Sequence, residues 1–105
     1  MSVSVVIPVY NTGDDLIERC IKSLENQIEQ PAEIILVNDG SGAVATECCN
    51  RMAKEHENIK VFHQRNSGVS VARNSGLKKA KGDWIMFVDP DDYTHSELIQ
   101  RLSGR

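Results

Sequence analysis

The chain has 105 residues, 40% of them hydrophobic and 26% charged, which is enough for one globular domain with a modest core. Its 12 basic and 15 acidic residues give a formal charge of −3, which argues against nucleic-acid binding. No apolar run approaches the roughly 20 residues of a membrane helix, and no basic segment precedes an apolar stretch at the start. We therefore expect a cytoplasmic chain, or part of a longer protein whose membrane anchor lies elsewhere.

The first half of the chain alternates strand and helix patterns. Residues 3–7 are a β-branched run that ends at Pro8, which predicts a buried strand. A helical period with a wide apolar stripe covers residues 16–28 and ends before Pro31. Residues 33–38 are predicted to form a second apolar strand, which ends at an Asp-Gly-Ser-Gly turn.

The same alternation continues in the second half. A helix is expected over residues 45–56, followed by a short strand over residues 59–63. The Asn-Ser-Gly turn at 66–68 leads into a helix over residues 69–80, with lysines in its last turn. The fourth strand is predicted over residues 84–88.

A final helix is predicted near the end of the chain. Thr94, His95, Ser96 and Glu97 have the pattern of a capping box, which is typical of a helix start. The apolar residues of this helix would be Leu98, Ile99 and Leu102.

Three cysteines, Cys20, Cys48 and Cys49, fall on the predicted helices. An odd number with two adjacent residues is a poor disulfide framework and lacks the spacing of a zinc site. We expect thiols packed as small hydrophobic residues, in a reducing compartment.

Four strand–helix pairs with continuous apolar strands predict an α/β fold: a Rossmann-like, three-layer α/β/α arrangement around a mostly parallel sheet. Ligands of such sheets bind beyond the carboxyl ends of the strands. Polar segments follow three of the predicted strands, at residues 10–11, 38–41 and 89–92. They should meet at one edge of the sheet and form a site.

The acidic turn Asp89-Pro90-Asp91-Asp92 offers three carboxylates in four positions. Such close like charges repel, and Mg²⁺ or Mn²⁺ shared with diphosphate oxygens would relieve this repulsion. An ordinary solvated turn, with Asp92 capping the last helix, explains the same residues equally well.

The other two polar segments have similar alternatives. Tyr10 can stack on a planar base or lie half-buried at a rim. Asp39 can accept a hydrogen bond from a base, and Gly40 allows a ligand to approach the backbone, but an ordinary capped turn is favoured for this segment taken alone. Arg73 can reach a diphosphate, or it is simply a surface arginine. The histidines, His56, His63 and His95, are interpreted as surface or capping residues.

Four segments follow one another in order along the chain. They are Val-Ser-Val-Val-Ile-Pro-Val-Tyr-Asn at 3–11, Glu-Ile-Ile-Leu-Val-Asn-Asp-Gly-Ser at 33–41, Asn-Ser-Gly-Val-Ser-Val-Ala-Arg-Asn-Ser-Gly at 66–76 and Gly-Asp-Trp-Ile-Met-Phe-Val-Asp-Pro-Asp-Asp at 82–92. Together they resemble the N-terminal half of family 2 glycosyltransferases, with their nucleotide-diphospho-sugar transferase fold. The resemblance spans nearly the whole chain.

The resemblance implies a role for each matching position. The nucleotide-binding residues would be Pro8, Tyr10, Asn11, Asp39, Gly40, Arg73 and Asp89. Among them Pro8, Tyr10 and Asp39 match the base pocket, and Arg73 matches an arginine near the diphosphate. Asp89 and Asp91 match the family's Asp-x-Asp motif, and Asp92 is the alternative metal ligand. The first carboxylate of the usual Asp-Asp-Gly-Ser is Asn38 here, so we expect altered affinity or sugar choice.

The activity implied is inverting transfer of a sugar from a nucleotide diphosphate sugar, most simply a UDP-sugar, to a hydroxyl of a saccharide or lipid-linked acceptor. Mg²⁺ or Mn²⁺ would assist, and the product would belong to polysaccharide or glycolipid synthesis. In the family the general base lies beyond the region matched here, so we expect it beyond Arg105. The chain would then be a donor-binding fragment, truncated, inactive alone, and able to form homo-oligomers through its uncovered surface.

Two other classes of protein are considered. A dinucleotide-binding oxidoreductase has similar alternation, but residues 8–13 lack the Gly-x-Gly-x-x-Gly that it needs. A non-catalytic module that binds nucleotide sugars or another protein remains the alternative to a transferase.

Overall fold

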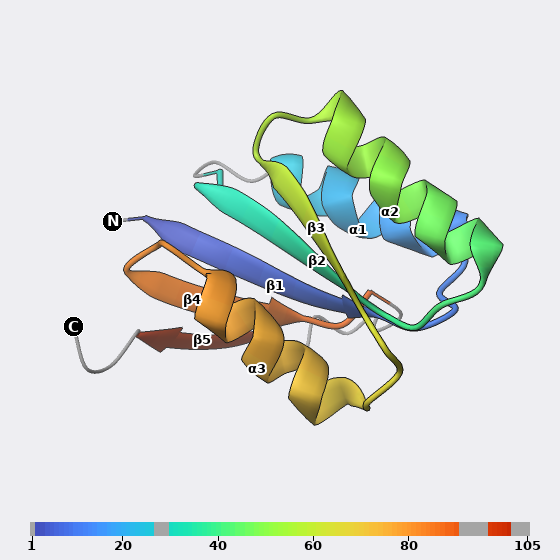
Figure 1. The fold of residues 1–105 in the computed structure, drawn as a ribbon. Coiled ribbons are helices and arrows are strands. Elements are labelled where there is room, and N and C mark those ends of the chain that lie inside the picture. The colour runs from blue at the N-terminus through green and yellow to red at the C-terminus, as the bar shows by residue number, and fades with distance from the viewer. Residues whose placement is uncertain (1, 27–29, 91–96, 102–105) are drawn as a thin grey trace.

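A computed structural model describes residues 2–26, 30–90 and 97–101, and shows strands and helices in alternation around one sheet (Figure 1). The sheet has five strands in the order β3-β2-β1-β4-β5. The pairs among the first four are parallel, and β5 is antiparallel to β4, so the predicted mostly parallel α/β fold is confirmed. The elements are β1 Val3–Val9, α1 Asp14–Glu25, β2 Glu33–Asp39, α2 Ala43–Glu55, β3 Ile59–Gln64, α3 Val69–Lys79, β4 Trp84–Val88 and β5 Glu97–Arg101.

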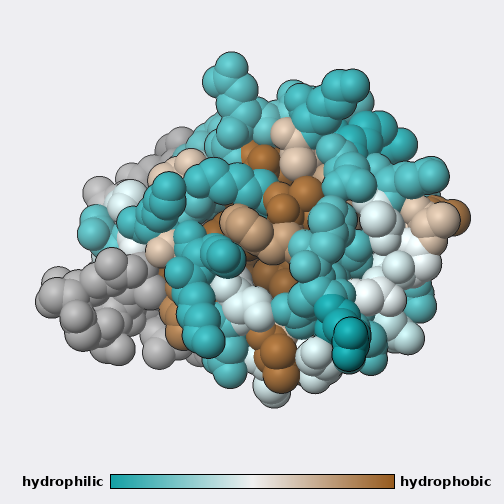
Figure 2. Space-filling model, viewed as in Figure 1, coloured by the Kyte–Doolittle hydropathy of each residue, from teal (hydrophilic) through white to brown (hydrophobic). Residues whose placement is uncertain are grey.

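The sheet separates two hydrophobic cores. Because side chains alternate along a strand, Val5, Ile7 and Val9 of β1 pack with α1 and α2, whereas Val6 packs with α3. The helices therefore cover both faces, as Figure 1 shows, and the three-layer prediction holds. On the α3 side, hydrophobic surface gathers over the sheet between α3 and β3 and is ringed by hydrophilic side chains (Figure 2).

Strand β1 continues through Pro8 to Val9, so the prediction that it ends at Pro8 was wrong. The carbonyl of Ser2 accepts a hydrogen bond from Trp84 on the β4 side, whereas the carbonyl of Val3 accepts one from Ala32 on the β2 side. Successive residues point to opposite neighbours, so Pro8 faces β4 as Ser2 does. Strand β4 pairs with β1 only as far as Val6, and the N–H that proline lacks is not needed there.

The final helix predicted from Thr94 was also wrong, because Glu97–Arg101 forms strand β5. Without β5, the outer side of β4 would present a row of unpaired backbone groups. Antiparallel pairing, with Val88 opposite Glu97 and Trp84 opposite Arg101, supplies those groups with partners and overrides the local capping signal. The capping residues before Glu97 lie outside the described residues.

Other boundaries differ less. Helix α1 begins at Asp14 and ends at Glu25 rather than near residue 28. Helix α2 ends at Glu55, and His56 is its C-cap, as the capping interpretation predicted. None of the described helices combines the length and the apolar character that crossing a membrane requires.

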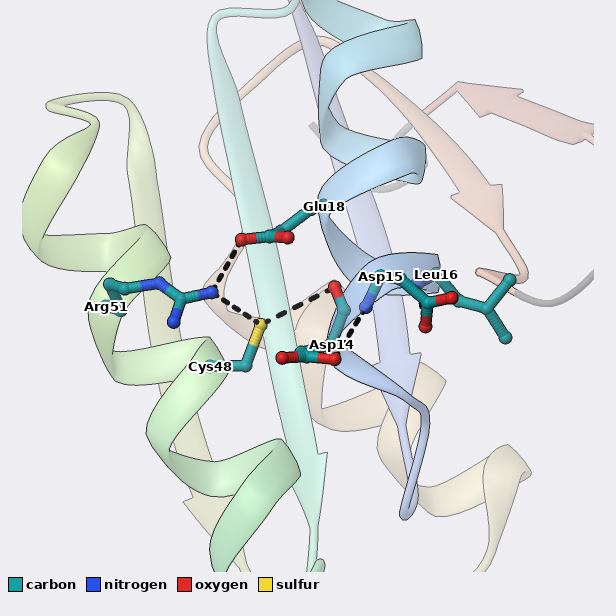
Figure 3. A network of polar contacts seen from close by, with 6 residues as sticks. All are labelled: Asp14, Asp15, Leu16, Glu18, Cys48 and Arg51. Carbon is teal, nitrogen blue, oxygen red and sulfur yellow. Dashed lines mark hydrogen bonds and ion pairs between the residues drawn. The ribbon is translucent and has the colours of Figure 1, made fainter.

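Helices α1 and α2 are joined by a polar network on the face of the sheet that they share (Figure 3). Arg51 forms an ion pair with Glu18 at 2.6 Å, and its second neighbour is the Cys48 sulfur at 3.8 Å. Cys48 and Cys49 are free, buried thiols, and Cys20 packs against the same core, as expected of small hydrophobic residues. Burial raises the pKa of Cys49 to about 12.

Candidate functional site

A cleft of about 370 Å³ opens at the carboxyl edge of the sheet. It brings together Tyr10 after β1, Asp39 at the end of β2 and Asp89 after β4, which are the three polar segments predicted to converge. The turn before α3 and the first turn of α3 complete its wall. The lining residues are Pro8, Val9, Tyr10, Thr12, Asp39, Asn66, Gly68, Val69, Ala72, Asp89 and Pro90.

Asp39 is a buried carboxylate, 3% exposed, that is held by donors from two segments. Its Oδ1 accepts hydrogen bonds from Gln64 Nε2 and the Ser67 N–H, both at 2.8 Å. Its Oδ2 accepts the Gly68 N–H at 3.0 Å and, more weakly, Asn66 Nδ2 at 3.4 Å. Burial alone would raise the pKa of Asp39, but the bonds from Gln64, Ser67 and Gly68 lower it below its ordinary value.

The turn at 66–68 is a wall of the cleft that the sequence did not assign to the site. Asn66 and Gly68 line the cleft, and Gly68 has φ +100°, a conformation that favours glycine. The sequence predicted this turn and the helix after it, but its attachment to Asp39 depends on the packing of β2 beside β3. Thr12 at the other wall was missed as well.

Asn11 and Gly40 contact neighbouring loops of the protein. Neither is among the residues that line the cleft. The Asn11 N–H donates to Ser41 Oγ at 2.9 Å, and Asn11 Oδ1 accepts the Gly42 N–H at 2.7 Å. Gly40 has φ +71°, and a Cβ there would lie 2.6 Å from the Asn66 nitrogen. Both residues therefore hold the loops around the cleft, and a nucleotide contact from either stays a prediction.

Asp89 lines the cleft beside an arginine. Arg73 lies 3.6 Å from Asp89 Oδ2, with its side chain 42% exposed and that of Asp89 38% exposed. The Arg73 Nε is buried and has no hydrogen-bond partner among the described residues. Arg73 therefore lies beside the first residue of the acidic turn, with its guanidinium only loosely paired, and its contact with a diphosphate stays a prediction.

Of the three metal ligands predicted from the sequence, Asp89 lies among the described residues. Asp91 and Asp92 lie outside the described residues, as does His95. In the described part of the chain no three His, Cys, Asp or Glu side chains form a metal-binding group. Asp89 is a carboxylate at the edge of the cleft, the hard oxygen donor that Mg²⁺ and Mn²⁺ prefer, so its chemistry fits such an ion.

Asn38 and His63 lie beside the cleft and stabilise the neighbouring loop. The Asn38 amide donates to Thr46 Oγ1 at 2.9 Å and lies 3.0 Å from His63 Nδ1, while its Oδ1 accepts the Ser41 N–H at 3.2 Å. His63 Nε2 lies 2.9 Å from Asn50 Oδ1. Asn38 is buried and does not line the cleft, and its described bonds stabilise the loop after β2. The altered affinity or sugar choice expected from Asn38 stays a prediction.

Comparison with known proteins connects this geometry to a family. The sequence profile described as glycosyl transferase family 2 matches residues 4–105. The chain is 48% identical over 101 residues to the uncharacterized glycosyltransferase EpsJ of Bacillus subtilis, covering 96% of this chain and 29% of that protein. Across the curated relatives that it matches, the chain spans between 14% and 33% of their length.

Two solved structures share the fold. S. aureus TarS 1-349 in complex with UDP-GlcNAc is 34% identical with a TM-score of 0.75, covering 89% of this chain and 27% of that one. The mannosyltransferase PcManGT from Pyrobaculum calidifontis, in complex with GDP-Man and Mn²⁺, is 25% identical with a TM-score of 0.74. That match covers 85% of this chain and 27% of the mannosyltransferase chain.

Proposed function

We propose that this chain, which belongs to glycosyl transferase family 2, binds the nucleotide diphosphate part of a sugar donor in the cleft at the carboxyl edge of its sheet. The observation that carries the proposal is the meeting of Tyr10, Asp39 and Asp89 in one cleft. An aromatic ring, a buried acceptor and a carboxylate that can share a cation suit the base, the ribose and the diphosphate of such a ligand. The donor is a UDP-sugar, and the protein to which the chain belongs transfers its sugar to an acceptor hydroxyl with inversion.

Different residues of the chain would contact different parts of the donor. Tyr10 is 57% exposed at the mouth of the cleft, where its ring can stack on a base. Arg73 would exchange its loose pairing with Asp89 for the diphosphate oxygens. Asp89, with Asp91 and Asp92, would hold Mg²⁺ or Mn²⁺, which supplies a positive charge to the departing diphosphate.

The described carboxylates of the cleft are unsuited to act as the general base. Asp39 is surrounded by donors that favour its ionised form, and Asp89 pairs with Arg73. A base must be able to take the proton of the acceptor hydroxyl. We therefore propose that this part of the domain binds the donor and that the base comes from outside the described residues.

Calorimetric titration of the chain tests this proposal. UDP is expected to bind more tightly with Mn²⁺ than without, and NAD is expected not to bind, because no dinucleotide fingerprint is present. Asp89→Asn should remove most of the gain from Mn²⁺. The matched control is Asp83→Asn, which makes the same chemical change at an exposed aspartate bonded to Ser2. Tight NAD binding with no UDP binding would contradict the proposal.

A further inference from the structure

Gln64 is the last residue of β3 and lies opposite Asp39 in the parallel register of β2 and β3. It does not line the cleft, but its amide connects Asp39 to helix α3. Gln64 Nε2 donates to Asp39 Oδ1 at 2.8 Å, and Gln64 Oε1 accepts from Ser75 Oγ at 2.7 Å. The amide orientation follows from the carboxylate, because the reversed amide would place Oε1 against Asp39 Oδ1.

The donors around Asp39 leave its carboxylate little freedom. A carboxylate has about four acceptor positions. Gln64, Ser67 and Gly68 occupy three of them at 2.8–3.0 Å, and Asn66 approaches the fourth only weakly, at 3.4 Å. Three of these donors belong to the turn at 66–68, which forms one wall of the cleft. Gln64 is the one that comes from a strand, and a strand is a firmer support than a turn.

We propose that Gln64 is a positioning residue of the cleft, which fixes the Asp39 carboxylate and thereby the turn at 66–68. The Ser75–Gln64–Asp39 chain of hydrogen bonds joins the middle of α3, the edge strand β3 and the end of β2. It sets the wall formed by Asn66 and Gly68 at a fixed distance from Tyr10 and Asp89 across the cleft. The functional consequence, tighter nucleotide binding, rests on the function proposed above.

The test is Gln64→Glu, which has nearly the same shape but replaces the donor by a second carboxylate. Two adjacent carboxylates share one proton at low pH and repel each other once both are ionised. The Asp39 contacts should therefore be retained at about pH 5 and lost toward about pH 8. A residue that merely fills space would give no such pH dependence.

Two readouts are measured between about pH 5 and 8. The first is the NMR resonances of the Ser67 and Gly68 amides in the free chain, which should titrate in Gln64→Glu beyond any change in the wild type. The second is the affinity for UDP with Mn²⁺, which should be about tenfold weaker than wild type near pH 8 and close to wild type near pH 5.

Two further variants complete the design. Gln64→Met should weaken UDP binding at every pH without a titration. Gln30→Glu makes the same chemical change at an exposed glutamine bonded to the Glu25 carbonyl, and should leave both readouts unchanged. If the Ser67 and Gly68 amides of Gln64→Glu behave as in the wild type, the positioning role is wrong. If they titrate while the wild type fails to bind UDP, the positioning role stands and the nucleotide-binding function is wrong.

Discussion

Strand β2 begins and ends with a buried carboxylate, and each one fastens a different edge of the sheet. Glu33 accepts hydrogen bonds from Ser4 Oγ at 2.7 Å and the Lys81 N–H at 2.6 Å, and pairs with Lys60 at 3.3 Å. Asp39 performs the same task for the turn before α3. A buried carboxylate is stable only with such donors, so both residues help to hold the fold together.

Glu33→Gln is expected to lower the free energy of unfolding by about 1–3 kcal/mol at neutral pH, because a charge-assisted acceptor is lost. Burial alone would raise the pKa of Glu33, but the bonds from Ser4, Lys81 and Lys60 lower it below its ordinary value of 4.5. The stabilisation is therefore fully present above about pH 4.5 and is lost as the pH falls through the lowered pKa. Urea denaturation at several pH values checks this: the gap between variant and wild type should narrow in acid, and a constant gap would refute the account.

Tyr10→Ala should weaken UDP binding by about 1–3 kcal/mol through loss of stacking. Because the side chain is 57% exposed, the melting temperature should hardly change. Tyr10→Phe keeps the ring and serves as the control, with affinity close to wild type. Equal affinities of Tyr10→Ala and wild type for UDP would show that the uracil base does not stack on this ring.

At the residue scale, strand ends were sufficient to predict Tyr10, Asp39 and Asp89 as neighbours. The partners of Asp39 could not be predicted, because Gln64, Ser67 and Gly68 are 25 to 29 residues away in sequence and meet it only through β-sheet register. The same holds for Asn11 and Gly40, because no local sequence pattern indicates their contacts with other loops.

At the scale of elements, helix α3 sits unusually close to β1 because Gly76 faces the sheet. A Cβ at Gly76 would overlap Val6 Cγ1 and lie 3.1 Å from Val6 Cγ2. This contact sets the depth of α3 and with it the position of Arg73, one turn earlier, opposite Asp89.

Gly76→Ala should therefore destabilise the protein by about 1–3 kcal/mol through overpacking. Helix propensity alone predicts the opposite sign, a gain of about 1 kcal/mol. Chemical denaturation distinguishes the two effects. Adding Val6→Ala should make the two substitutions less costly together than the sum of each alone, and strict additivity would argue against the proposed contact.

The elements themselves were largely predictable, because β-branched runs and helical periods are local. The exceptions have non-local causes. Pro8 stays in β1 because β4 stops pairing at Val6, and residues 97–101 become a strand because β4 needs a partner. A local capping box carries no information about an unpaired edge on another strand.

At the scale of the whole molecule, the packed faces of the sheet are separate from its carboxyl edge, where the proposed donor site lies. The carboxyl edge collects Tyr10, Asp39 and Asp89 from strands widely separated in sequence, whereas Glu33 and Ser4 lie near the opposite edge. The chain spans less than a third of EpsJ, and we propose that the acceptor-binding residues and the catalytic base lie outside the described residues.

The most direct test of the account is to map where UDP binds. In an NMR titration of the isotopically labelled chain with UDP and Mg²⁺, the amides of residues 9–12, 39, 66–69 and 89 are expected to shift. The amides near Glu33 and Lys81, at the opposite edge, are expected to stay in place. UDP-induced shifts concentrated at that opposite edge, or absent from the cleft, would contradict the proposal that this cleft is the donor site.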